Sequence, residues 1–315
     1  HRSQHAERRG VPAEEAPRTT LMLAQICAEA GVDAGVVNVV TGQPAMISRH
    51  LLASPVIRKV SLTGSVPVGQ ELLRLCAELI KPVTLELGGH SPVLVFADAD
   101  VETAAKTCAL AKFRNMGQVC IAASRFYVHQ DVVEAFTAKF VEVARSLRIG
   151  RGSEEGVDVG PLSNRRRLEA TQKLLEDAVG KGAKVGAGGG RPSGFDRGYF
   201  FEPTVLTGVD TTMRVMIDEP FCPIAPITSF STLDEALEMA NASPYGLAGY
   251  VFTRDTKTAF LASERLDVGM VGVNNLVIAT AEIPFGGVKL SGFGREGGCE
   301  GIESYTVSKY INFLL

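Results

Sequence analysis

The sequence predicts an α/β protein with parallel β-structure, organised in two domains. Strand-like and helix-like stretches alternate along much of the chain, which is typical of βαβ units. A length of 315 residues can bury two medium-sized cores, and a composition of 45% hydrophobic and 21% charged residues is ordinary for a globular protein. These observations together favour layers of helices packed on parallel sheets.

A first series of elements begins with a helix over residues 19–30, which Gly31 ends. Nothing before this helix has a strand pattern. The following stretches alternate in type, and we expect their strands to form one parallel sheet: strand 36–40, helix 44–53, strand 56–62, helix 66–80 and strand 83–87.

A second series supports the second domain. Its stretches have either a run of β-branched residues or an apolar helical face: strand 92–96, a helix from Val101, strand 126–128, helix 132–147, helices 233–242 and 257–266, and strands 247–252 and 270–273. The glycine-rich stretches 152–160 and 186–198 are predicted to be surface loops.

Charge and cysteine usage narrow the classes of partner. The net charge is -3, so no basic surface for nucleic acid or an anionic membrane is expected. No apolar stretch reaches the roughly 18 residues that suggest a membrane span. The 6 cysteines form no CxxC pair and lack histidines at ligand spacing, which favours reduced thiols over a metal site or disulfides. We expect a cytoplasmic protein that acts on a small molecule.

Cys120 and Glu86 are the candidate catalytic residues. Cys120 follows a turn that contains Gly117, and Glu86 ends a predicted strand before Gly88 and Gly89. A thiol and a carboxylate are the two groups that covalent chemistry on a carbonyl carbon requires. Taken singly, each has a plainer interpretation, as an inert cysteine and a solvated glutamate.

The turn at Gly64 and Ser65 is a candidate anion site. It joins a predicted strand to a helix that has Pro67 in its first turn, and the free N–H groups of such a helix start suit a dinucleotide pyrophosphate. The stretch lacks the full G-x-G-x-x-G pattern, and the same turn is common as plain architecture.

The chain resembles the NAD(P)-dependent aldehyde dehydrogenases from about Val11 to Tyr310, most closely the succinate-semialdehyde dehydrogenases. The motifs that carry the resemblance are Pro12-Ala13-Glu14, residues 38–42, Thr63-Gly64-Ser65, Glu86-Leu87-Gly88-Gly89, residues 113–120, residues 219–223, Tyr245-Gly246-Leu247 and residues 284–292.

The resemblance implies an aldehyde dehydrogenase-like fold with three parts. These are a partial Rossmann-type dinucleotide-binding domain over 1–88, an α/β catalytic domain over 89–285, and a return segment with an oligomerisation strand over 286–315. The family's Trp-Asn-Phe-Pro-like segment has no counterpart before Pro12, so we expect an N-terminally truncated chain whose complete protein is a homodimer or homotetramer.

The resemblance also implies roles for individual residues. Cys120 matches the nucleophile that forms a thiohemiacetal and then a thioester, and Glu86 matches the general base. The implied cofactor contacts are Glu14, Gly64, Ser65, Gly69, Leu87, Glu219 and Phe221. Because Glu14 matches a contact to the adenosine ribose, where a carboxylate repels a 2'-phosphate, NAD is expected rather than NADP.

Arg114 is the expected substrate contact. In succinate-semialdehyde dehydrogenases a Phe-Arg-Asn arrangement resembles a site where the arginine binds the distal carboxylate of the substrate, a task that suits a guanidinium. Its plainer interpretation is a cation at a helix end. Thr280 matches a hydroxyl position in the same pocket.

The predicted function is oxidation of an aldehyde, such as succinate semialdehyde, to the acid with NAD. Val11 and Cys222 depart from the lysine and glycine usual in the family. These departures and the missing asparagine motivate an alternative, a catalytically impaired or non-catalytic remnant that binds a nucleotide or a partner subunit. A cofactor-independent thiol esterase is a third hypothesis.

Overall fold

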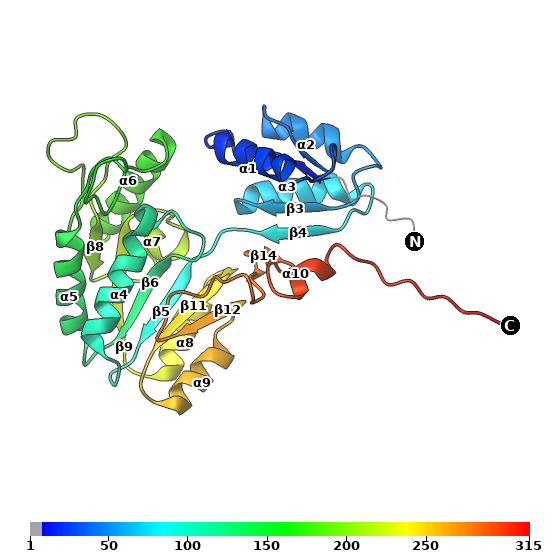
Figure 1. Cartoon of the computed structure of the whole chain (residues 1–315). Coiled ribbons are helices and arrows are strands. Elements are labelled where there is room, and N and C mark those ends of the chain that lie inside the picture. The colour runs from blue at the N-terminus through cyan, green and yellow to red at the C-terminus, as the bar shows by residue number, and fades with distance from the viewer. Residues whose placement is uncertain (1–7) are drawn as a thin grey trace. The chain divides into compact units, whose positions relative to one another are not determined.

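The computed structural model describes residues 8–315, which form two compact units (Figure 1). The first unit consists of the chain up to Val60 together with Gln70–Val83. The second consists of Ser61–Gly69 and Thr84–Leu315. The catalytic candidates Cys120 and Glu86 both lie in the second unit.

The first unit contains a two-stranded parallel sheet, in which β1 (Arg8–Gly10) pairs with β2 (Val37–Val39). Helices α1 (Pro17–Glu29) and α2 (Pro44–Leu52) each begin with a proline at the first turn. Gly31, at φ 86°, follows α1 as predicted. The expectation that no strand precedes α1 is wrong, because β1 is a short Arg-Arg-Gly stretch without the apolar pattern that identifies strands from sequence.

A three-stranded sheet carries Glu86. Its order is β14 (Gly292–Phe293), β4 (Val83–Glu86) and β3 (Val60–Thr63), and α3 (Val66–Ala77) follows β3. The expected single parallel sheet from the first strands of the chain is therefore wrong. Those strands belong to two small sheets, and β4 pairs on one side with the antiparallel β14 from near the C-terminus, a long-range pairing that local pattern does not reveal.

The second unit is built on a seven-stranded sheet with the order β12-β11-β5-β6-β9-β8-β7. All its pairings are parallel except that of β7 with β8. The strands are β5 (Ser91–Val95), β6 (Ala123–His129), β7 (Lys184–Ala187), β8 (Thr204–Thr207), β9 (Ile224–Phe230), β11 (Ala248–Phe252) and β12 (Met270–Val273).

Helices cover both faces of this sheet, and strand residues alternate between two apolar clusters (Figure 1). Val93 and Tyr250 pack with α4 (Val101–Phe113) and α5 (Val133–Ser146) on one face. Leu94 and Tyr127 point to the opposite face, where residues of α8 (Leu233–Asn241) and α9 (Thr256–Arg265) complete the cluster. Burial on both faces is what a parallel sheet requires.

Sequence reasoning missed the elements between α5 and α8, which are α6 (Arg165–Gly180), β7, β8, α7 (Arg214–Ile217) and β9. Stretch 152–160 contains no helix or strand beyond an isolated bridge at Val159, in keeping with a loop. Stretch 186–198 is a loop only after Ala187, because its first residues belong to β7.

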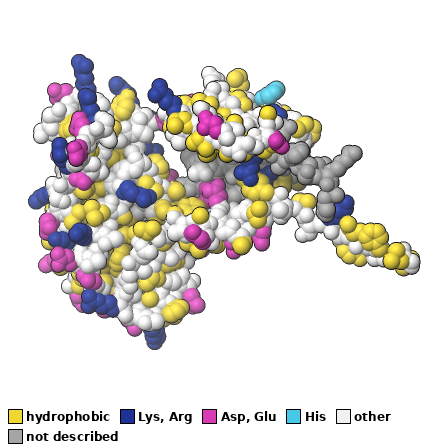
Figure 2. All heavy atoms as spheres, viewed as in Figure 1, with side chains coloured by type: hydrophobic (Ala, Val, Ile, Leu, Met, Phe, Trp, Pro, Cys, Tyr) yellow, Lys and Arg dark blue, Asp and Glu magenta, His cyan; other side chains and the backbone are white. Residues whose placement is uncertain are grey.

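The C-terminal part contains β13 (Val288–Lys289), which pairs with β10 (Tyr245–Gly246), and the one-turn helix α10 (Glu300–Glu303). Residues 306–315 have no secondary structure, and Figure 2 shows their apolar side chains exposed at the end of the chain. A strand here that contacts another subunit stays a prediction. Within residues 8–315, no helix is long and apolar enough to cross a membrane.

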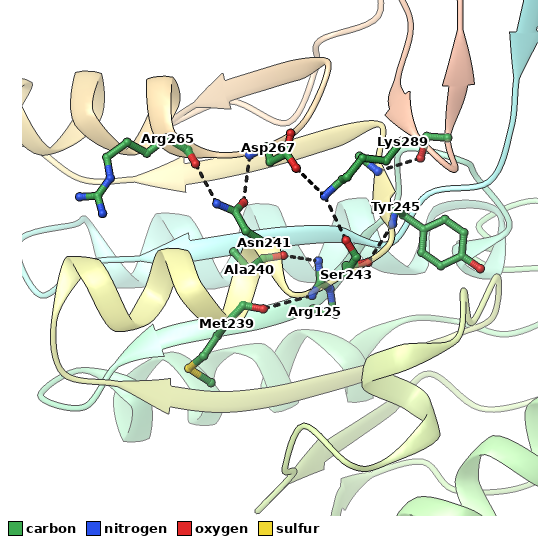
Figure 3. A network of polar contacts seen from close by, with 11 residues as sticks. Arg125, Met239, Ala240, Asn241, Ser243, Tyr245, Arg265, Asp267 and Lys289 are labelled. Carbon is green, nitrogen blue, oxygen red and sulfur yellow. Dashed lines mark hydrogen bonds and ion pairs between the residues drawn. The ribbon is translucent and has the colours of Figure 1, made fainter.

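Buried Arg125 ties β6 to the end of α8 (Figure 3). Its guanidinium donates to the carbonyl oxygens of His90 at 2.9 Å and Ala240 at 3.0 Å, and to the Tyr127 hydroxyl at 3.1 Å. Nearby, Lys289 Nζ donates to the Ser243 carbonyl at 3.0 Å. These contacts satisfy buried carbonyl groups, among them that of Ala240 at the end of α8, that would otherwise lack a donor.

Replacement of Arg125 by methionine should lower the free energy of unfolding by about 3 kcal/mol, because several buried acceptors lose their donor at once. Urea denaturation provides the measurement. Arg254→Met is the matched control: its side chain is 70% exposed and forms a surface ion pair with Asp100, so the change should stay within about 0.5 kcal/mol. Equal losses in the two variants would contradict a structural role for the Arg125 contacts.

Candidate active site

The candidate site lies where the chain enters the middle strands of the seven-stranded sheet. Gly88 and Gly89 precede β5, Cys120 precedes β6, Glu219 precedes β9 and Leu247 precedes β11. These strands are neighbours and run parallel, so the segments before them meet at the same, amino-terminal edge of the sheet. The order of the strands thus brings together residues that are far apart in the sequence.

The Gly88-Gly89 turn is the point where two of these segments touch. The Gly89 N–H donates to Oε1 of Glu219 at 3.0 Å. A Cβ at Gly88 would lie 2.2 Å from Oε2 of Glu219, and one at Gly89 would lie 2.7 Å from the Cys120 carbonyl oxygen. Only residues without a side chain leave room for Glu219 and Cys120 here.

The segment before Cys120 is an unusual turn. Helix α4 passes into the short 3-10 helix η1 (Arg114–Gly117), in which Asn115, Met116 and Gly117 have positive φ angles. A Cβ at Gly117 would lie 2.3 Å from the Cys222 carbonyl oxygen, so the turn packs closely on the Glu219–Pro223 segment. Asn115 and Gln118 close the turn with two side-chain to backbone hydrogen bonds of 3.0 Å each.

Glu86 is a buried carboxyl group without a hydrogen-bond partner for either oxygen within the described chain. Burial raises its pKa to about 8, with a further contribution from the negative charge of Glu296, while Arg295 acts in the opposite direction. Glu86 is therefore protonated at neutral pH and becomes a base as the pH passes about 8.

The Cys120 thiol is half-buried, and its pKa is raised mainly by burial. The charges of Glu219 and Glu86 raise it further, whereas the backbone N–H groups of Ile121 and Cys120 itself stabilise the thiolate. Burial also raises the pKa of Glu219, whereas the hydrogen bond from the Gly89 N–H and the charge of Arg167 lower it. The resting site thus favours a thiol, which gains reactivity when a base removes its proton.

The Gly64–Ser65 turn lies beside Glu86. The Gly64 N–H donates to the Glu86 carbonyl oxygen at 2.9 Å, and exposed Ser65 precedes α3. A Cβ at Gly69, one turn into that helix, would lie 2.8 Å from Leu87 Cδ1, so a side chain there would collide with Leu87. The structure brings together the predicted cofactor residues Gly64, Ser65, Gly69 and Leu87.

The remaining predicted residues differ in what surrounds them. Exposed Arg114 and Cys120 both act electrostatically on the Tyr250 hydroxyl, which places them in one neighbourhood. Thr280 is exposed and hydrogen-bonds the Glu282 carboxylate, which lowers the pKa of that group; within residues 8–315 it makes no hydrogen bond to Arg114 or Cys120. Glu14 lies in an exposed turn of the first unit.

Two residues that sequence reasoning did not single out contact the segments that carry the predicted residues. Arg167 donates to the Pro220 carbonyl at 3.2 Å and lies 5.4 Å from the ring centre of Phe221, a residue with φ 42°. Ser291 donates to the Gly88 carbonyl at 2.7 Å and accepts from the Gly246 N–H at 3.0 Å. Ser291 lies inside a quoted motif, while Arg167 has no sequence signal.

Cys222 is fully buried, close to the equally buried Lys112. Burial lowers the pKa of Lys112 to about 8, and its Nζ has no hydrogen-bond partner within the described chain. Both residues lie behind the turn that carries Cys120, since a Cβ at Gly117 would meet their two carbonyl oxygens. No group of three or more His, Cys, Asp and Glu side chains suited to a metal ion occurs in residues 8–315.

Comparison with known proteins gives consistent results. Residues 11–311 match a family model described as "Aldehyde dehydrogenase family". A 3-sulfolactaldehyde dehydrogenase of Pseudomonas putida is 46% identical over 300 residues, covering 95% of this chain and 61% of that protein. An NADP(+) succinate-semialdehyde dehydrogenase of Escherichia coli is 41% identical over 301 residues, with 95% and 62% covered.

A solved structure agrees with these sequence matches. The succinate-semialdehyde dehydrogenase of Burkholderia pseudomallei superimposes with a TM-score of 0.93 at 42% identity, covering 96% of this chain and 62% of that one. The predicted fold class is therefore confirmed. The chain spans about three fifths of the length of the proteins that it matches.

Replacement of Glu86 by glutamine should make the protein relatively more stable as the pH rises. The folded protein holds a proton on Glu86 that the unfolded chain loses near pH 4.5, so wild-type stability falls as the pH rises from there through about 8. The neutral glutamine lacks this loss, and its advantage should grow by about 4 kcal/mol between pH 5 and pH 9. Urea titrations between pH 5 and 9 measure it, with exposed Glu134→Gln as control. A pH-independent difference would contradict the prediction.

Proposed function

We propose, because the chain belongs to the aldehyde dehydrogenase family, that it oxidises an aldehyde to the carboxylic acid with a nicotinamide cofactor. The observation that carries the proposal is the close packing of the Cys120 segment, the Gly88-Gly89 turn and Glu219 at one edge of the sheet. A thiol, a base and a carboxylate that can bind a ribose are the groups this reaction needs.

In the proposed mechanism, Cys120 Sγ attacks the aldehyde carbon to form a thiohemiacetal. A bound nicotinamide cofactor would supply the acceptor for the hydride of this carbon, and loss of that hydride and of the hydroxyl proton would leave a thioester on Cys120. The N–H groups of Cys120 and Ile121 lower the pKa of the thiol and so favour the thiolate that attacks. Hydrolysis of the thioester releases the acid and restores the thiol.

Glu86 is the proposed base for Cys120 or for the hydrolytic water. Its buried carboxyl oxygens have no partner among residues 8–315, so they are available to accept a proton from a group that enters the site. Because its pKa is raised to about 8, the base form is scarce at neutral pH. The proposal therefore implies a rate that increases with pH up to about 8.

The residues present fit a dinucleotide. Gly64 and Ser65 are exposed before a helix of 12 residues, where backbone N–H groups favour a pyrophosphate. Glu219, fixed by the Gly89 N–H, would hold the nicotinamide ribose, and Phe221 would pack nearby. Glu14 supports NAD over NADP through repulsion of a 2'-phosphate, although the E. coli relative is an NADP(+) enzyme by name.

The proposed substrate is an aldehyde with a negatively charged far end, such as succinate semialdehyde. Exposed Arg114 shares the neighbourhood of Cys120 and forms no ion pair within residues 8–315, so its guanidinium can bind an anion, with Thr280 as a further polar contact. The name of the P. putida relative supports a second candidate, an aldehyde that carries a sulfonate. Both substrates present oxygen atoms to the same arginine.

A homodimer or homotetramer is the proposed assembly of the complete protein. Strand β12 lies at the edge of the seven-stranded sheet, with one side unpaired among residues 8–315. Residues 306–315 expose Tyr310, Phe313 and other apolar side chains that a partner subunit could cover. The three-part division at residues 88 and 285 and the cytoplasmic location also remain proposals.

The function is tested by nucleotide reduction. We expect the chain, extended to the length of its relatives, to reduce NAD with succinate semialdehyde, and Cys120→Ala to remove the activity by at least about 10³-fold. Absorbance at 340 nm gives the rate. Absence of reduction with every aldehyde and both nucleotides would overturn the proposal and favour the non-catalytic alternative. Ester hydrolysis without nucleotide would identify the esterase instead.

Replacement of Arg114 by methionine should raise KM for succinate semialdehyde about 30- to 100-fold, because a charge-assisted bidentate contact is lost. KM for butanal, which has the same length but no charge, should change little. Arg151→Met, in an exposed loop, is the control. Steady-state kinetics with both aldehydes and with the sulfonate analogue measure these effects. An equal loss for butanal would rule out recognition of the distal anion.

A further inference from the structure

Tyr250 is a buried tyrosine whose hydroxyl reaches the turn that carries the proposed nucleophile. It lies on β11, next to β5 in the sheet, and is 1% exposed. Its hydroxyl donates to the carbonyl oxygen of Ile121, the residue after Cys120, at 2.7 Å. The contact spans two strands of the sheet, since β5 lies between β11 and β6.

The neighbouring edge strand leaves space for this tyrosine. Tyr250 pairs with Gly272 of β12 and with Val93 of β5. A Cβ at Gly272 would lie 3.0 Å from Tyr250 Cδ1, which is tighter than ordinary van der Waals contact. The ring is therefore confined between its neighbours, and its hydroxyl has a fixed position relative to the turn.

The turn held by Tyr250 is the one that presents the sulfur of Cys120. It is closed by a hydrogen bond from the Ala122 N–H to the Val119 carbonyl at 3.0 Å. The N–H groups of Cys120 and Ile121, one on each side of the Cys120 Cα, lower the pKa of its thiol. The Ile121–Ala122 peptide unit is thus held at both ends, by Tyr250 at its carbonyl and by Val119 at its N–H, and the closed turn sets where the Cys120 and Ile121 N–H groups lie relative to the sulfur.

We propose that Tyr250 is a positioning residue for Cys120: its hydroxyl fixes the Ile121 carbonyl, and so holds the closed turn in the conformation that places the Cys120 and Ile121 N–H groups beside the sulfur. This inference rests on the proposed role of Cys120 as nucleophile. Tyr250 touches neither substrate nor cofactor in this scheme, and acts only through the backbone of the turn.

The test is the pH dependence of Cys120 alkylation by iodoacetamide, followed by mass spectrometry of the Cys120 peptide. In Tyr250→Phe the midpoint should move to higher pH, and the rate at pH 7 should fall roughly three- to tenfold, as a shift of half to one pKa unit gives. The reaction needs neither aldehyde nor nucleotide. A protein that alkylates as predicted but never reduces NAD would refute the proposed function and leave the positioning role standing.

Tyr127→Phe is the matched control. Tyr127 is equally buried, at 1% exposure, and its hydroxyl donates to the Met239 carbonyl at 3.2 Å on the opposite face of the sheet. Loss of a buried hydroxyl affects stability in both variants, but only Tyr250→Phe should move the alkylation midpoint. If both variants keep the wild-type pH profile of alkylation, or if the midpoint shifts equally in both, the proposal is overturned.

A second variant separates positioning from folding. Tyr250→p-aminophenylalanine keeps a donor at the same place on the ring and should restore the wild-type midpoint. If Tyr250→Phe does not fold, this variant is compared with wild type directly. A folded p-aminophenylalanine variant with the wild-type midpoint supports the role of the donor, and one with the midpoint displaced overturns it.

Discussion

The close approach at Gly88 and Gly89 is the constraint on which the site depends. The backbone of this turn comes so near to Glu219 and Cys120 that a single methyl group on either glycine would collide with one of them. The turn also links the three-stranded sheet to the seven-stranded sheet, since it joins β4 to β5. Ser291 bonds the Gly88 carbonyl from the return segment, so the position of the turn is fixed from outside the site. Glu86, Glu219 and Cys120 are therefore held by backbone geometry more than by contacts between their own side chains.

The electrostatics of the site follow from this packing. Glu86, Glu219 and Cys120 are acidic groups brought together in a largely buried place, and burial raises the pKa of each. Their mutual repulsion adds to the effect on Cys120. A site of this kind disfavours the anionic form of each group, and Glu86 loses its proton as the pH passes about 8. Apolar contacts elsewhere in the fold offset the unfavourable free energy of burying these groups.

Sequence reasoning found the parts of the fold and site that are encoded locally. Helix α9 and strand β12 lie where the periodic pattern placed them, and Cys120 and Glu86 could be predicted as catalytic candidates because the motifs around them are contiguous. Helix α6 was missed because it begins with three arginines, and β1 because it is short and charged. Arg167 and Tyr250 could not be predicted. Their roles depend on contacts with Pro220 and Ile121, which lie far away in the sequence and become neighbours only through the strand order.

The position of the site at the amino-terminal edge of its sheet distinguishes this protein from most open α/β folds, in which ligands bind beyond the carboxyl ends of the strands. Here Asp98, which follows β5, links the carboxyl end of that strand to the residues that follow β11. Its carboxylate accepts hydrogen bonds from the Thr253 hydroxyl at 2.9 Å and from the N–H groups of Arg254 and Asp255 at 2.8 and 2.7 Å. The Asp98 carboxylate is thus satisfied within the chain. The carboxyl oxygens of Glu86, which ends β4 of the three-stranded sheet, lack partners among residues 8–315, so they can form a hydrogen bond to a group that enters the candidate site.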